Sequence, residues 1–209
     1  MRSTRGRRGR LVAIEGIDGA GKSTLARAIA AALRRRGFSV ALRHEPSDPK
    51  LGALAQAVSK TDAWSGAVYF TVDRYLARPA LERALARHDV VVTDRSFYST
   101  LAYQGSTLAR REQRRLNELE RSATRVPNQV ILLDVPLSAA LHRLGGRRRV
   151  RGPLEERATL ARVARAYRTL SRDPRWVVLD ARAPKRQLVR EALTHLRVPR
   201  AVARPTRRT

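Results

Sequence analysis

The sequence predicts an α/β fold of three layers, in which a five-stranded parallel sheet lies between helices on both faces. Two observations support this. Short apolar runs alternate with longer segments of helical period along the whole chain. The runs are apolar at consecutive positions, which is typical of strands that are buried on both faces. The 209 residues suffice for one buried core, so we expect a single domain.

The expected elements follow from these runs and periods. Strands are expected at residues 10–15, 38–42, 89–93, 129–134 and 176–180, and helices at residues 23–36, 51–58, 65–87, 137–144, 154–171 and 185–196. The first helix carries Leu25, Ile29 and Leu33 on one face, and Gly37 fits the position that ends it. Pro79 is expected to break or bend the third helix, because proline lacks the N–H of the helical ladder.

The domain is expected to span residues 10–197, with a short arginine-rich lid at about residues 143–153. Residues 1–9 and 198–209 are rich in Arg, Pro, Ser and Thr and are expected to be basic flexible tails. No apolar run is long enough to span a membrane or to form the core of a signal peptide, so a cytoplasmic protein is expected. The absence of cysteine excludes disulfides and thiolate metal sites.

The net charge is +26, from 44 basic and 18 acidic residues. Such a surface attracts polyanions, including nucleotides and nucleic acid. The arginines are spread along the whole chain, which favours a compositional preference that specifies no site. We therefore expect nucleic acid to bind only through nonspecific electrostatics.

A phosphate-binding loop is predicted where the first strand meets the first helix. The segment GIDGAGKS matches G-x-x-x-x-G-K-[ST] at every fixed position, between an expected strand and an expected helix. Glycines let backbone N–H groups turn toward a phosphate, and the helix adds the positive end of its dipole. Lys22 supplies charge to the β- and γ-phosphates, and the Ser23 hydroxyl can ligate Mg²⁺. The expected ATP-binding residues are Gly16, Ile17, Asp18, Gly19, Ala20, Gly21, Lys22, Ser23 and Thr24.

The loop alone does not distinguish a kinase from a GTPase or a motor ATPase. The guanine-reading segment N-K-x-D of GTPases is absent, and the chain is short for a nucleic-acid motor. Ligands of this architecture bind at the carboxyl ends of the strands. Charged residues stand at those expected ends: Glu15, Glu45, Asp94, Asp134 and Asp180.

Four segments in order resemble the thymidylate kinase family. They are EGIDGAGKST from Glu15, the pair Glu45-Pro46, YFTVDR ending at Arg74, and DRSFYSTLAYQG from Asp94. The last is the most specific, and the four cover roughly residues 11–105. The resemblance implies a P-loop kinase fold, ATP as phosphate donor, Mg²⁺ as cofactor, a deoxynucleoside monophosphate as acceptor and a homodimer of packed helices.

The resemblance also implies how the acceptor is held. Phe70 would stack on the thymine ring, and Arg74, on the same helix face, would donate to a base carbonyl. Ser99 and Thr100 would complete the recognition of the base edge. Tyr103 would pack against the deoxyribose.

Other implied roles concern the phosphates and the metal. Arg95 would clamp the monophosphate, for which a guanidinium fork is suited. Asp18 would hydrogen-bond the sugar 3′-hydroxyl or a Mg²⁺-bound water, and Asp94 would hold Mg²⁺ through water or orient Arg95. Glu45 would order Mg²⁺ waters or the acceptor, and Gln104 would support the sugar or base.

A lid is expected in the arginine-rich stretch after Gly145. Lids of nucleotide kinases bring arginines to the charge that develops on the transferred phosphoryl group. Arg147 and Arg149 are therefore candidate catalytic residues beside Lys22, Arg95 and Asp18, and Glu155 would help to form the acceptor site once the lid closes. A solvated basic turn is the alternative for this stretch.

Structural alternatives exist for the acceptor residues too. Phe70 and Tyr103 could be core residues, and Ser99 and Thr100 could hydrogen-bond within a helix. Two sequence-adjacent acid–arginine pairs, at residues 73–74 and 94–95, could be structural ion pairs. Ser96 stands where the family usually has an aromatic residue or histidine, and His44 where it usually has arginine.

The predicted reaction is the phosphorylation of dTMP to dTDP by ATP with Mg²⁺, a step of nucleotide biosynthesis. Another nucleoside or nucleoside-monophosphate kinase on the same fold is the nearest alternative. A nucleic-acid-binding P-loop ATPase is a more distant one, suggested by the positive charge.

Overall fold

The computed structural model describes residues 9–145 and 153–196. Its sheet has five parallel strands in the order β2-β3-β1-β4-β5, so β1 occupies the centre. The strands are β1 Arg10–Glu15, β2 Val40–His44, β3 Val90–Asp94, β4 Gln129–Asp134 and β5 Trp176–Asp180. The α-helices are α1 Lys22–Arg35, α2 Pro49–Val58, α3 Ala63–Arg87, α4 Phe97–Tyr103, α5 Arg110–Ala123, α6 Leu137–Gly145, α7 Pro153–Leu170 and α8 Lys185–His195. A 3₁₀ turn, η1 Gly105–Thr107, follows α4.

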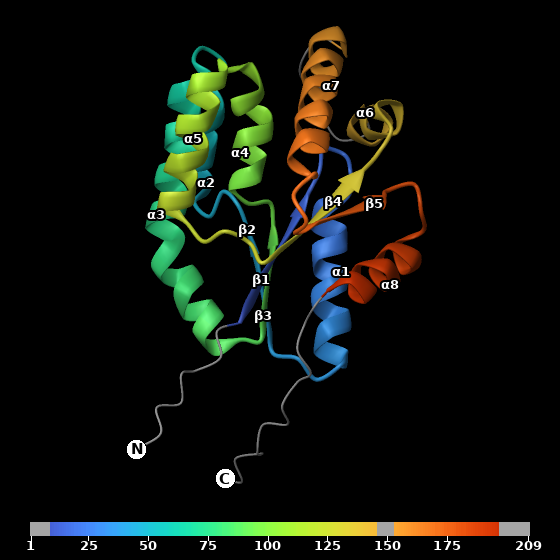
Figure 1. The fold of residues 1–209 in the computed structure, drawn as a ribbon. Helices are drawn as coiled ribbons and strands as arrows, with labels where there is room; N and C mark the ends of the chain where they lie inside the picture. The colour runs from blue at the N-terminus through green and yellow to red at the C-terminus, as the bar shows by residue number, and fades with distance from the viewer. Residues whose placement is uncertain (1–8, 146–152, 197–209) are drawn as a thin grey trace.

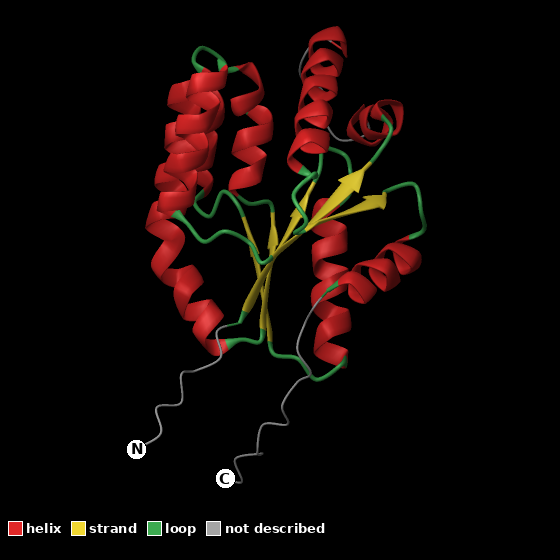
Figure 2. Cartoon of the chain, in the orientation of Figure 1, coloured by secondary structure: helices red, strands yellow, loops and turns green. Residues whose placement is uncertain are grey.

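Helices lie on both sides of the sheet, as predicted (Figures 1 and 2). Helices α1 and α8 pack together on one side, whereas α3 packs with α5 on the other. The buried face of α1 includes Leu25, Ile29 and Leu33, which join the strands in the main core. On the other face, Leu11 and Val91 of the sheet pack against Leu81 and Leu85 of α3. Both faces of the central strands are therefore withdrawn from water, which explains their unbroken apolar runs.

Three of the five strands begin and end where the sequence predicted, and β2 and β3 are displaced. Strand β2 begins at Val40 because the two residues before Ser39 still belong to the end of α1. The N–H of Gly37 donates to Arg34 and that of Phe38 to Leu33, and Gly37 has a φ of 84°. This is the arrangement that ends a helix on a left-handed residue. The predicted role of Gly37 is confirmed, and the predicted strand 38–42 was two residues early.

Helices α4 and α5 were not predicted. Helix α5 is mostly charged, and its buried residues are Leu116, Glu120 and Ala123 only. A glutamate in the middle of the buried face hides the apolar period on which a sequence-based prediction depends. Helix α3 continues across Pro79 and changes direction along its length, so the predicted bend rather than a break is found (Figure 1).

The fold brings the carboxyl ends of the neighbouring strands β1, β2 and β3 together on one side of the sheet. The loop that follows β1 is flanked by Asp94 at the end of β3, and the N–H of Glu45 donates to the carbonyl of Asp94. The structure thus gathers the charged residues that the sequence placed at strand ends.

The two basic tails and the centre of the predicted lid fall outside the described residues. Within the described residues, no helix is long and apolar enough to cross a membrane. The cytoplasmic location stays a prediction.

Candidate active site

The loop from Gly16 to Ser23 has the backbone that a phosphate cradle requires. Gly16, Gly19 and Gly21 have φ values of 147°, 81° and 99°, a range that side chains other than glycine rarely adopt. A Cβ at Gly19 would lie 2.5 Å from the carbonyl oxygen of Ala140, so α6 packs directly on the loop. Sequence motif and local geometry therefore agree.

The N-terminus of α1 is open to an anion. Its N-cap is Gly21, which has no side chain to accept from the first N–H groups, and no acidic residue lies in the first turn. These N–H groups and the helix dipole therefore stay available for phosphate oxygens. Ser23 and Thr24, in the same turn, are exposed.

Lys22 lies back over this loop. Its ammonium donates to the carbonyl of Ile17 at 2.9 Å and lies 3.6 Å from Oδ1 of Asp18. The residue is only 6% exposed. Burial lowers the pKa of Lys22 to about 8, Arg95 adds to this effect, and Asp18 opposes it. The ammonium of Lys22 thus lies against the loop for which the motif predicts phosphate binding.

Arg95 reaches the loop from the end of β3. It is the one described residue other than glycine with a positive φ, 71°. Three contacts hold this backbone: its N–H donates to Ile14, its carbonyl accepts from the Thr93 hydroxyl at 2.8 Å, and the next N–H, of Ser96, donates to Glu15 at 2.7 Å. A conformation of this kind persists where its surroundings fix it, and it is frequent at functional sites.

The Arg95 side chain joins the two predicted half-sites. Its guanidinium is hydrogen-bonded to the carboxylate of Asp18, donates to the Ser99 hydroxyl at 3.2 Å and lies 5.4 Å from the centre of the Tyr103 ring. The Asp18 N–H donates to the Tyr103 hydroxyl at 2.9 Å. Burial alone would raise the pKa of Asp18, but Arg95 and Lys22 bring it below its ordinary value. The loop and the DRSFYSTLAYQG segment therefore meet at Asp18.

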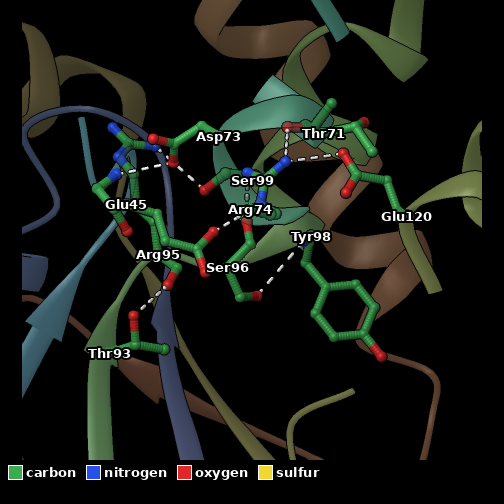
Figure 3. A network of polar contacts seen from close by, with 12 residues as sticks. Glu45, Thr71, Asp73, Arg74, Thr93, Arg95, Ser96, Tyr98, Ser99 and Glu120 are labelled. Carbon is green, nitrogen blue, oxygen red and sulfur yellow. Dashed lines mark hydrogen bonds and ion pairs between the residues drawn. The ribbon is translucent and has the colours of Figure 1, made fainter. Parts of the chain in front are cut away.

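Arg74 is the centre of a second, buried cluster (Figure 3). Its Nε donates to Glu45 at 2.6 Å, and its Nη1 donates to Thr100 at 2.9 Å and to Glu120 at 2.8 Å. Its Nη2 donates to the carbonyl of Ser96 at 3.3 Å. Sequence reasoning missed Glu120, since it lies on the helix that was not predicted.

The sequence identifies Glu15 as a charged strand end and predicts no role for it. It is fully buried and accepts hydrogen bonds from the Ser96 N–H, from the Ser96 and Ser99 hydroxyls and from the Tyr167 hydroxyl, at 2.7 to 2.8 Å. Helices α4 and α7 are thereby tied to the strand that carries the loop. The hydroxyl of Ser96, at the position where the chain departs from the usual family residue, is one of these donors.

The remaining predicted residues are placed as follows. Phe70 is half-buried and joins neither hydrophobic cluster in the described part of the chain. Gln104 donates to the Ser59 hydroxyl at 3.2 Å. Asp73 accepts from two backbone N–H groups, those of Ser47 and Asp48, instead of pairing with its neighbour. Arg147 and Arg149 fall outside the described residues, and the side chain of Glu155 is not described.

The residues that could hold a metal are few. Among the described residues no group of three or more His, Cys, Asp or Glu side chains could ligate one. Mg²⁺ usually keeps several waters and takes one or two protein oxygens beside the substrate phosphates, so a larger cluster is not required. Oδ1 of Asp94 is buried without a hydrogen-bond partner in the structure, and this orphaned oxygen fits such a ligand or the water of one.

The fold and the loop together define a P-loop nucleotide-binding protein. Arg95, which reaches the loop from the end of the neighbouring strand β3, fits a phosphotransferase. The sequence profile of the family described as thymidylate kinase matches residues 14–192. The chain therefore belongs to the thymidylate kinase family, as the four motifs indicated, and it is a kinase of nucleoside monophosphates.

Individual relatives agree with this assignment. A protein named "Probable thymidylate kinase" from Metallosphaera sedula is 36% identical over 178 residues, which are 85% of this chain and 87% of the relative. One of the same name from Thermococcus gammatolerans is 38% identical over 66% of this chain and 72% of its own length. A "Thymidylate kinase" from Xanthomonas oryzae is 36% identical over 88% of this chain and 81% of its own.

Proposed function

We propose that this protein transfers the γ-phosphoryl group of ATP to dTMP, giving ADP and dTDP. The observation that carries the proposal is the meeting of Asp18 with Arg95 and Tyr103. In this contact, two residues proposed to hold the acceptor touch the loop proposed to hold the donor, and this supports the proposal. Phosphoryl transfer needs two nucleotides in line and charge neutralisation between them, rather than a covalent intermediate.

On the donor side, the loop N–H groups and the N-terminus of α1 bind the β- and γ-phosphates. The Lys22 ammonium, which donates to the Ile17 carbonyl at 2.9 Å, has only to turn toward the γ-phosphate to neutralise the charge that develops there. Mg²⁺, when bound, would neutralise part of the phosphate charge. Ser23 and Asp94 are the residues that would hold it.

On the acceptor side, Arg95 is proposed to bind the dTMP phosphate. Its guanidinium is prearranged by Asp18, Ser99 and the ring of Tyr103, so little side-chain entropy is lost when the phosphate binds. Phe70, which is half-buried outside the core clusters, has an aromatic face available to the base.

The other acceptor roles extend this arrangement. Tyr103 is proposed to pack on the deoxyribose, and Arg74 to donate to the base. Arg74 donates to Glu45 and Thr100, which hold it in place, and Arg95 donates to Ser99. Gln104 is proposed to support the sugar or base. Arg147, Arg149 and Glu155 are proposed to complete the site from the lid.

The test is an acceptor panel with coupled detection of ADP. Purified protein with ATP and Mg²⁺ is offered dTMP, dUMP, dCMP, dAMP, dGMP and thymidine in turn. We expect dTMP to give the highest kcat/KM. Faster turnover of another monophosphate or of a nucleoside would replace dTMP as the substrate. ATP hydrolysis that depends on nucleic acid, without transfer to any monophosphate, would instead support a nucleic-acid-dependent ATPase.

We also propose that the protein is a homodimer that pairs through α3. One face of this helix exposes Tyr69, Val72, Tyr75 and Leu76, which are 36% to 63% exposed, and Leu54 of the neighbouring α2 is 44% exposed. Their spacing of three and four residues makes them one continuous stripe. A large exposed apolar patch of this kind is typical of an interface.

Light scattering of the purified protein tests the dimer. One chain has a mass of 23.4 kDa, and we expect the wild-type protein to have twice this mass. The double variant Tyr75→Lys/Leu76→Lys should have the mass of one chain. A wild-type protein that is monomeric at micromolar concentration would contradict the proposal.

A further inference from the structure

The single positive charge of Arg74 is paired with two carboxylates, those of Glu45 and Glu120. Glu45 approaches its Nε from the end of β2, and Glu120 approaches its Nη1 from α5, at 2.6 and 2.8 Å (Figure 3). Arg74 is 4% exposed and Glu120 is fully buried. The pair of Arg74 and Glu45 is already neutral, so the second carboxylate is not required for charge balance.

Glu120 is therefore a poor candidate for a residue that stabilises the fold. Burial of a carboxylate is unfavourable, and a buried ion pair is often no more stable than apolar residues of similar size. The environment reflects this: burial raises the pKa of Glu120 to about 7, although Arg74 acts to lower it, and the carboxylate of Glu45 raises it further. Helix α5 would bury its face more favourably with an apolar residue at this position, between Leu116 and Ala123.

What Glu120 does achieve is to fix the orientation of the guanidinium. An arginine has five N–H bonds: one on Nε and two on each terminal nitrogen. Glu45 uses the Nε bond, Thr100 and Glu120 use both bonds of Nη1, and the Ser96 carbonyl uses one of Nη2. Within the described part of the chain, the second N–H of Nη2 has no hydrogen-bond partner.

Removal of Glu120 would change which N–H bonds are occupied. Carboxylates prefer to bind a guanidinium through two parallel hydrogen bonds. Without the hydrogen bond from Nη1 to Glu120, Glu45 can accept from both Nε and Nη2. This pair would occupy the Nη2 N–H that is available in the wild-type protein. Glu120 and Glu45 on opposite edges of the guanidinium prevent this.

We propose that Glu120 is a positioning residue for the acceptor base. It keeps one Nη2 N–H of Arg74 available to the oxygen at position 4 of a pyrimidine. Thymine and uracil carry a carbonyl there, whereas cytosine carries an amino group that cannot accept this hydrogen bond. Glu120 thus contributes to the preference for dTMP over dCMP. This inference rests on the proposed function, in which Arg74 contacts the base.

The experiment compares Glu120→Gln with wild type. Glutamine keeps the shape of the side chain and removes its charge. We expect the ratio of kcat/KM for dTMP to that for dCMP to fall about tenfold, mainly through a higher KM for dTMP. The KM for ATP should change less than about twofold, because the loop lies outside the Arg74 cluster. Glu118→Gln is the matched control, since Glu118 lies exposed on the same helix.

A second variant separates positioning from folding. Glu120→Met removes the buried carboxylate and leaves the neutral pair of Arg74 and Glu45. We expect it to unfold at the same temperature as wild type or higher, while it shows the same loss of selectivity as Glu120→Gln. A purely structural Glu120 would give the opposite: a lower unfolding temperature with the dTMP/dCMP ratio unchanged.

The outcomes also separate this inference from the proposed function. If wild-type protein phosphorylates dTMP and both variants keep its dTMP/dCMP ratio, the positioning role is wrong and the function stands. If wild-type protein does not phosphorylate dTMP at all, the proposed function fails first.

Discussion

The donor and acceptor halves of this site are built in different ways. The proposed donor half is one continuous segment, Gly16 to Ser23, and its expected binding groups are backbone N–H groups and one lysine. The proposed acceptor half is assembled from the end of β2, the loop after β3, and helices α3, α4 and α5, and its expected binding groups are side chains. A local backbone site tolerates changes around it, whereas an assembled site depends on every element that holds it.

The largest expected effect comes from the donor half. We predict that Lys22→Ala lowers kcat by about 10²- to 10³-fold or more, because it removes the charge that compensates the transferred phosphoryl group. Circular dichroism and thermal unfolding should change little. Lys60→Ala, an exposed lysine after α2, is the control. A Lys22→Ala protein with the wild-type rate would exclude the loop as the site of chemistry.

The acceptor half should respond to Arg95→Ala almost as strongly. We predict a fall of about 10²-fold in kcat/KM for dTMP, since the phosphate loses its guanidinium partner. The KM for ATP should change far less, and this asymmetry sharpens the division into two halves. Arg35→Ala, at the opposite end of α1, should match wild type. Equal losses for both substrates would mean that Arg95 serves the loop instead.

The pH dependence of ATP binding should report Lys22. Its pKa is lowered to about 8, so the free protein carries the ammonium charge below that pH and loses it above. ATP favours the charged form, so its affinity should fall by up to about tenfold per pH unit above pH 8. Calorimetric titrations between pH 6.5 and 9.5 measure this fall. Lys22→Arg stays charged throughout, so a slope that persists in this variant would assign the titration to another group.

The contact between the halves should have the smallest effect. Tyr103→Phe removes the hydroxyl that accepts from the Asp18 N–H and keeps the ring beside Arg95. One hydrogen bond of this kind corresponds to a change of about three- to tenfold in kcat/KM for dTMP. Tyr98→Phe, on the same helix but packed against Phe97 and Trp176, is the control. Equal activities of the two variants would mean that the Tyr103 hydroxyl does not contribute to the contact between the two halves.

Much of the fold was predictable because its signals are local. Three strands were predicted to the residue, and the helix-ending role of Gly37 was predicted from its position alone. The prediction failed where tertiary contacts override the local pattern. Helix α5 has a buried glutamate on its core face, and its ion-pair partner, Arg74, lies far away in the sequence. The start of β2 depends on how α1 ends.

The same division applies to the site. The sequence by itself determined the phosphate loop, since glycines, lysine and serine at fixed spacing dictate a backbone cradle wherever they join a strand to a helix. It also named Arg74, Arg95 and Tyr103 through the family motifs. Only the tertiary structure decided that Asp18 joins Arg95 and Tyr103, that Glu15 ties α4 and α7 to the loop, and that Glu120 faces Arg74. These contacts connect residues between 46 and 152 positions apart, and no local pattern can specify which side chains a fold brings within hydrogen-bonding distance.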